Sequence, residues 1–122
     1  MTYTREMAQA EANLARAMQQ WNIVRTENSQ TGTGVFIDND TRVNGRIVPT
    51  RMEYVRNGNE LQVTRIQQGN TIIYGRDANG TCHESTQALD AFFTAQPQLE
   101  AVFNTFRPVM SIPFNQCRRM AR

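Results

Sequence analysis

Cys82-His83-Glu84 places three residue types that carry chemistry side by side. A thiolate next to a histidine base is the pairing that cysteine-dependent nucleophilic enzymes use. Here the two side chains are neighbours in the chain and point in different directions, and His83 is the sole histidine. A zinc site would need His83, both cysteines and a carboxylate, and the C-x-x-C spacing that supports such sites is absent. The sequence therefore predicts no catalytic residue, no cofactor and no metal ligand.

Cys82 and Cys117 are the only cysteines, and they are separated by 35 positions. A disulfide between them would fasten the C-terminal tail across the preceding helical segment and would contribute about 3–4 kcal/mol through loop closure. Disulfides persist in oxidising compartments. The pair therefore predicts an exported bacterial protein, periplasmic or secreted, whose signal peptide is absent from this chain. The alternative is a cytoplasmic protein with two buried thiols.

Asp38-Asn39-Asp40 begins like a calcium-binding loop. Counted from Asp38, Arg42 falls on a ligand position and Pro49 stands where the bidentate glutamate belongs. We therefore expect no calcium site here, and we expect Asn39 to Gly45 to form a polar turn.

The formal net charge is +2, and all thirteen basic residues are arginines. Four of them lie from Arg107 onward, where no acid occurs, and such a tail can steer towards an acidic partner or a phosphate backbone. The arginines of the central region are expected on both faces of a sheet, whereas a phosphate-tracking surface should be one-sided. Nucleic-acid binding through Arg118-Arg119 is therefore kept as a second alternative.

Residues 46–76 are expected to position whatever surface the protein uses, because they predict three strands joined by two-residue turns. Asn57-Gly58 and Gly69-Asn70 supply the positive φ angles that such hairpins need. With Asn57-Gly58 as the loop, Tyr54 falls opposite Leu61. One face then collects the apolar side chains Val48, Met52, Tyr54, Leu61, Val63, Ile72 and Tyr74. One apolar and one polar face are typical of an antiparallel sheet that covers a core.

The opposite face mixes charged and polar residues with a few apolar ones. Charged residues around a small apolar patch can mark an interface. The predicted partner-binding surface consists of Arg51, Glu53, Gln62, Thr64, Ile66 and Ile73.

Helices are expected on both sides of the central strands in the sequence. Apolar spacing predicts one helix over residues 4–20, and Ser85 and Pro97 are placed to begin two more. Two β-prone pieces, 21–27 and 35–38, suggest a first hairpin, and Pro108 should end the last helix. After Pro108 an irregular chain is expected.

These elements predict a single α+β domain over residues 1–122. It is an antiparallel meander of four to five strands, with an N-terminal helix and two C-terminal helices packed on one face. No apolar run approaches the roughly 18 residues of a membrane span. The expected function is that of a small exported, non-enzymatic module that binds another protein, of the inhibitor, immunity-protein or secretion-accessory type. The first alternative is an enzyme or small-ligand binder with a pocket between sheet and helices, near Trp21, Tyr54, Tyr74 and Phe103.

Overall fold

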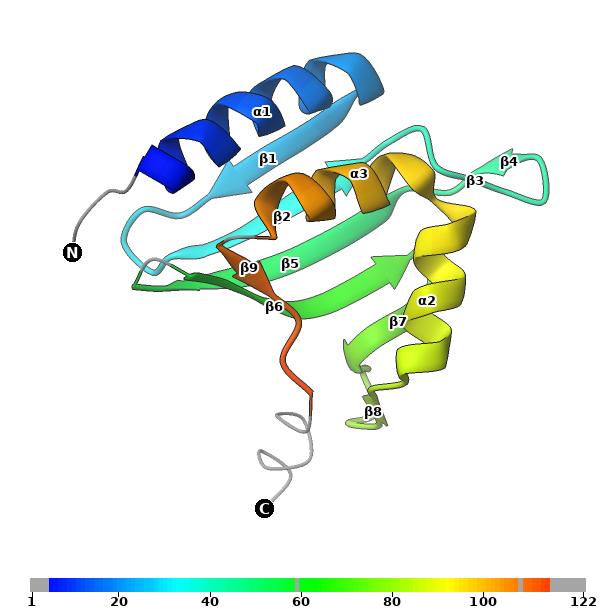
Figure 1. The fold of residues 1–122 in the computed structure, drawn as a ribbon. Helices are drawn as coiled ribbons and strands as arrows, with labels where there is room; N and C mark the ends of the chain where they lie inside the picture. Colours follow the sequence, from blue (N-terminus) through cyan, green and yellow to red (C-terminus); the bar gives the residue numbers. More distant parts are fainter. Residues whose placement is uncertain (1–4, 59, 108, 115–122) are drawn as a thin grey trace.

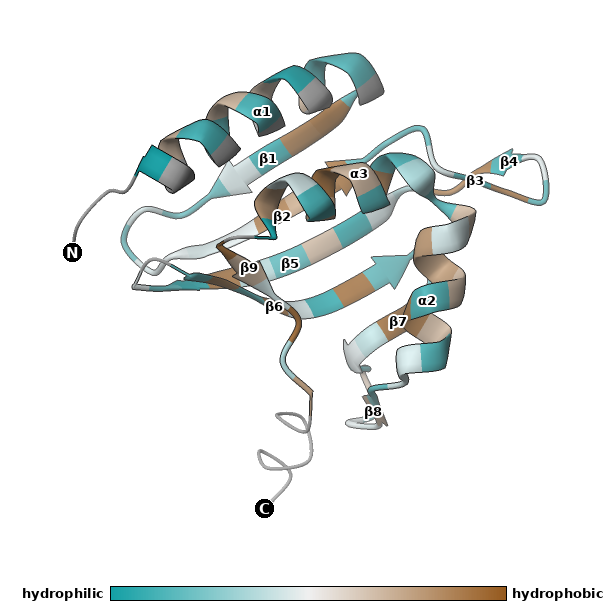
Figure 2. Cartoon of the chain, in the orientation of Figure 1, coloured by the Kyte–Doolittle hydropathy of each residue, from teal (hydrophilic) through white to brown (hydrophobic). Residues whose placement is uncertain are grey.

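The central strands of the computed structural model alternate hydrophobic and hydrophilic residues along the chain (Figure 2), and a layer of helices covers the sheet (Figure 1). The structure describes residues 5–58, 60–107 and 109–114. The main sheet has the strand order β1-β2-β5-β6-β7-β8. These strands span Ile23–Glu27 (β1), Thr33–Asp38 (β2), Thr50–Asn57 (β5), Glu60–Gln68 (β6), Thr71–Arg76 (β7) and Cys82–His83 (β8). The fold is therefore α+β with an antiparallel sheet, as predicted.

Three helices lie on the same side of this sheet (Figure 1). They are α1 (Arg5–Trp21), α2 (Thr86–Ala95) and α3 (Pro97–Phe106). The Ser85 side chain accepts a hydrogen bond from the Ala88 backbone N–H, so Ser85 is the N-cap of α2. Pro97 opens α3, where its missing N–H has no intrahelical partner to lose. Pro108 lies outside the described residues, and α3 ends at Phe106.

The predicted first hairpin is confirmed, because β1 and β2 pair antiparallel from Ile23 opposite Asp38 to Glu27 opposite Gly34. Residues 42–47 form a second, unpredicted ribbon instead of a plain turn. In it, β3 (Arg42–Val43) pairs with β4 (Arg46–Ile47) around Asn44-Gly45, whose φ angles are +53° and +80°. Figure 1 shows this ribbon projecting beyond the sheet.

The predicted register of the β5–β6 hairpin is wrong by two residues. Asn57 pairs with Glu60, so the loop begins at Gly58, and Tyr54 faces Val63 rather than Leu61. A shift of two keeps every side chain on its predicted face, because side chains alternate with a period of two. Tyr54, Leu61 and Val63 are accordingly buried in the core.

A β-bulge beyond Val63 changes the face of the residues that follow. Glu53 pairs with Arg65 and Met52 with Ile66, which leaves Thr64 as the extra residue. Ile66, predicted on the outer face, is consequently in the core with none of its surface exposed.

A second irregularity affects the β6–β7 hairpin, although its predicted Gly69-Asn70 turn is confirmed by the pairing of Gln68 with Thr71. Gln67 pairs with Ile72 and Ile66 with Tyr74, so Ile73 is the extra residue. Tyr74 is buried as predicted, whereas Ile73 packs against the core instead of facing outward. Ile72, predicted in the apolar face, lines the outer surface with Arg65 and Gln67.

The chain after α3 returns to the sheet, where an irregular segment had been expected. Strand β9 (Met110–Ser111) runs parallel to the start of β6, with Met110 beside Leu61. The Leu61 backbone N–H donates to the Val109 carbonyl at 2.6 Å. Within the described residues, no helix is long and apolar enough to cross a membrane.

Candidate functional site

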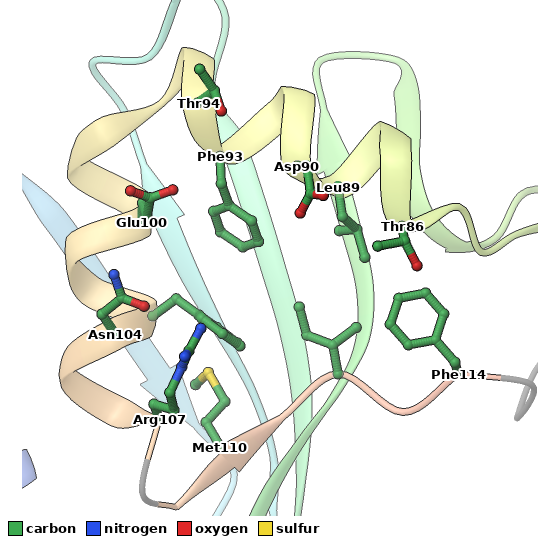
Figure 3. A pocket seen from close by; sticks show the side chains of 12 residues that line it. Thr86, Leu89, Asp90, Phe93, Thr94, Glu100, Asn104, Arg107, Met110 and Phe114 are labelled. Carbon is green, nitrogen blue, oxygen red and sulfur yellow. The ribbon is translucent and has the colours of Figure 1, made fainter.

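An open groove of about 710 Å³ lies between α2, α3 and the segment that contains β9 (Figure 3). We call it the helix groove. Its apolar lining consists of Leu89, Phe93, Phe103, Met110, Ile112 and Phe114. Its polar lining consists of Thr86, Asp90, Thr94, Glu100, Asn104 and Arg107, and all six of these residues are exposed. The groove therefore has an apolar floor and a solvated polar rim.

The floor arises where two helices meet at a sharp corner. Gln96 ends α2 and precedes Pro97, and its side chain is buried. The most buried residues of the two helices belong to the core of the protein. One partly buried phenylalanine of each helix, Phe93 or Phe103, packs against that core. The rings of Phe93 and Phe103 lie with their centroids 5.3 Å apart. Both side chains are only partly buried, so their outer surface is available to the groove.

Tyr74 holds the third wall of the groove in place. Its hydroxyl donates a hydrogen bond to the Pro113 carbonyl, and its ring meets the Phe114 ring edge-on at 6.1 Å. Burial, and then the nearby charge of Glu84, raises the pKa of Tyr74 to about 12. The hydroxyl therefore stays protonated at neutral pH and continues to donate to the backbone.

The charged residues of the rim are Asp90 of α2, Glu100 near the start of α3, and Arg107, which follows α3. Asp90 and Glu100 lie on either side of the Phe93 ring (Figure 3). Arg107 follows the last residue of α3, and its side chain runs back beside that helix, with the guanidinium carbon 5.9 Å from the centre of the Phe103 ring (Figure 3). A bound molecule would thus meet carboxylates at the corner of the helices and a cation near β9.

A second polar cluster lies beneath α1, around Arg25 of β1. The guanidinium lies 5.3 Å from the Phe36 ring and donates to the Tyr54 hydroxyl at 3.0 Å. It also forms ion pairs with Glu11 of α1 at 3.0 Å and with Glu27 at 3.2 Å. Each of the three guanidinium nitrogens of Arg25 therefore has a hydrogen-bond partner within the protein. The cluster therefore fastens α1 to the sheet and does not present a free group to a substrate.

Glu27 is the acidic centre of this cluster. The Tyr54 hydroxyl donates to Glu27 Oε1 at 2.6 Å, and Arg56 Nη2 donates to the same atom at 3.1 Å. Burial opposes the charge of Glu27, but the hydrogen bonds from Arg56 and Tyr54 outweigh it and lower its pKa. For Tyr54, burial and the hydrogen bond to Glu27 raise the pKa to about 12. Sequence reasoning missed this cluster because its polar members come from three different elements, α1, β1 and β5.

His83 is oriented by Asp77, whose Oδ2 lies 3.0 Å from His83 Nε2. The hydrogen bond with His83 lowers the pKa of Asp77. Within the described residues, no group of three metal-binding side chains is placed to hold an ion. Cys82 is in β8, whereas Cys117 lies outside the described residues, so the disulfide stays a prediction.

The predicted partner-binding surface on the outer sheet face is only partly present. Arg51, Glu53, Gln62 and Thr64 remain outside the core, and Arg65 binds Glu53 through two hydrogen bonds of 3.0 and 3.2 Å. The prediction was wrong for Ile66 and Ile73, which the two irregularities turn towards the core. That surface has therefore lost the two side chains that were expected to form its apolar centre.

The pocket expected near Trp21, Tyr54, Tyr74 and Phe103 is not formed by the described members of that set. Phe103 lines the helix groove, whereas Tyr54 and Tyr74 are buried in the core. The Trp21 side chain, Arg118 and Arg119 lie outside the described parts of the chain. No family model matches the chain, and no curated protein or solved structure matches it.

Proposed function

We propose that this protein is a small exported, non-enzymatic module that binds another protein, and that the helix groove is its binding surface. What supports the proposal is the combination of an apolar floor with an exposed polar rim. Protein interfaces commonly have an apolar centre surrounded by polar residues, with aromatic side chains enriched in the centre. The groove supplies aromatic rings from three segments, at Phe93, Phe103 and Phe114.

The openness of the groove favours a protein segment over a small molecule. Small-molecule sites usually bury most of the ligand surface. Here the six polar lining residues are all exposed, and Phe114 retains 38% of its surface. Segments of partner proteins are recognised in open grooves of this kind, through a few apolar anchors.

Export is proposed on the basis of the predicted Cys82–Cys117 disulfide. We expect no reactive thiol when the non-reduced protein is denatured and titrated with a thiol reagent. The same titration after reduction should give two thiols, which checks that both cysteines are accessible to the reagent. Two reactive thiols before reduction would contradict the disulfide and remove the reason for proposing an oxidising compartment.

The binding surface is tested with two matched substitutions of exposed apolar residues. Phe114→Asp places a charge in the groove, and Val24→Asp places one on a strand that does not line the groove. Phe114 and Val24 retain 38% and 47% of their surface, so both variants should fold. Partners captured by the oxidised wild-type protein from cells of its source are identified by mass spectrometry and compared with those of each variant.

A protein retained by the wild type and by Val24→Asp, but lost with Phe114→Asp, is the expected result. Equal retention by both variants would contradict the groove as the binding surface. Circular dichroism spectra of the two variants should match the wild type, so that a loss of binding can be assigned to the groove.

A further inference from the structure

We propose that the helix groove selects an amphipathic partner segment with cationic side chains, and that Asp90 and Glu100 recognise the cations. This inference rests on the proposed function, because it names the chemistry of the segment that the groove would bind. The occupant presents apolar side chains to the aromatic floor and arginine or lysine to the corner where the two helices meet.

The charge of the two helices is the first observation that carries this proposal. Residues 86–106, which include both helices, contain two acids and no base. Those acids, Asp90 on α2 and Glu100 on α3, both line the groove and are both exposed. They flank the Phe93 ring, so one bound segment can contact the ring and both carboxylates (Figure 3).

The second observation is that these two carboxylates are unused within the described part of the chain. Neither has an ion pair or a side-chain hydrogen bond there, and neither has an interaction of another kind. Other acids of the sheet are engaged by neighbours: Glu27 by Arg25 and Arg56, and Glu53 by Arg65. Among residues 5–58, 60–107 and 109–114, these strand carboxylates have partners within the protein, whereas the two groove carboxylates have none.

The position of Arg107 gives the occupant a direction. Arg107 follows Glu100 by seven residues, which corresponds to about 10 Å along a helix. Its guanidinium lies against the Phe103 ring at the end near β9 and would repel a cation there. The cationic residues of the segment should therefore lie at the Asp90–Glu100 end, with apolar or acidic residues at the Arg107 end.

The test uses two synthetic peptides of equal length with blocked ends. Both carry leucine at positions i, i+3, i+4 and i+7 of a helix, the spacing that lines one helical face. One peptide carries arginine at the flanking positions and the other carries glutamate. Binding to the full-length protein is measured by calorimetry, and the contact surface is mapped from backbone amide NMR shifts.

We expect the arginine peptide to bind about ten-fold more tightly than the glutamate peptide at low salt, because two rim charge pairs contribute modestly and additively. The preference should shrink as salt screens these pairs. The double variant Asp90→Asn/Glu100→Gln should reduce it to about two-fold or less. Asp40→Asn, which removes an exposed acid of the polar turn that precedes β3, should leave it unchanged.

Each other outcome overturns the inference in a distinguishable way. Equal binding of both peptides in the groove would show that charge is not selected, while the proposed function would stand. Tighter binding of the glutamate peptide would mean that Arg107, and not Asp90 and Glu100, determines which charge the groove prefers. Binding of neither peptide would count against both the inference and the groove as a peptide-binding surface.

Discussion

Gly34 of β2 faces Tyr54 of β5 so closely that a Cβ atom at position 34 would lie 2.3 Å from Tyr54 Cζ. Glu27 pairs with Gly34 on the other side, so the three residues form one row across the sheet. The Tyr54 ring crosses above Gly34 and places its hydroxyl 2.6 Å from Glu27 Oε1. The glycine is needed here for space, and it allows a side chain of β5 to reach β1 over the intervening strand.

Gly34→Ala should therefore destabilise the protein by about 1–3 kcal/mol, the usual range for forcing extra atoms into a packed site. Chemical denaturation monitored by circular dichroism measures this free energy of unfolding. Thr33→Ala is the matched control, because Thr33 is the adjacent exposed residue of the same strand.

A double-mutant cycle separates the clash from other effects of the alanine. In a Tyr54→Leu background the ring is absent, so Gly34→Ala should cost much less than in the wild type. An equal cost in both backgrounds would contradict the steric explanation.

Local signals were sufficient to predict the three helices and the five longer strands of the fold. The Gly69-Asn70 turn, the Ser85 cap and the Pro97 helix start each depend on a few neighbouring residues, and each is present in the structure. The identity of the core strands followed from alternation, which tolerates a register error of two. This is why Leu61 and Val63 are buried although their predicted partners were wrong.

The parts that could not be predicted depend on contacts between distant segments. A bulge adds one residue to one strand, and nothing at Thr64 marks it in the sequence. Strand β9 exists because β6 has an open edge beside Leu61, which lies 49 positions earlier than Met110. The groove depends in turn on β9 and on the corner at Gln96. The sequence placed Phe103 near a pocket between sheet and helices, and it gave no sign of the groove that Phe103 lines.

The corrected faces of β6 and β7 give a direct prediction. Ile66→Ala should destabilise the protein by about 2–5 kcal/mol, because it leaves a cavity in a fully buried site. Ile72→Ala should cost clearly less, since Ile72 is half-buried on the outer surface. Urea denaturation of both variants compares the two losses, and Val24→Ala provides an exposed control from β1. In the predicted sheet without bulges, Ile72 would be in the core and Ile66 on the outer face. Ile72→Ala would then lower the free energy of unfolding more than Ile66→Ala.

Because of its two buried tyrosines, we expect the protein to become less stable in alkaline solution. The pKa values of Tyr54 and Tyr74 are raised from 10.0 to about 12. Below pH 10 both hydroxyls are protonated in the folded and the unfolded chain, and their stabilisation is fully present. Between pH 10 and about 12 the unfolded chain ionises first, so the free energy of unfolding should fall as the pH rises through this interval.

Tyrosinate absorbance measures the same shift in the folded protein. A Tyr3→Phe background removes the third tyrosine of the chain, so the remaining signal comes from Tyr54 and Tyr74. Both should titrate near pH 12 in the folded state and near 10 in urea. Tyr54→Phe and Tyr74→Phe, made separately in this background, assign each step and should each weaken the alkaline loss of stability. A folded-state midpoint near 10 would mean that neither hydroxyl is held by Glu27 or by the Pro113 carbonyl as the structure has it.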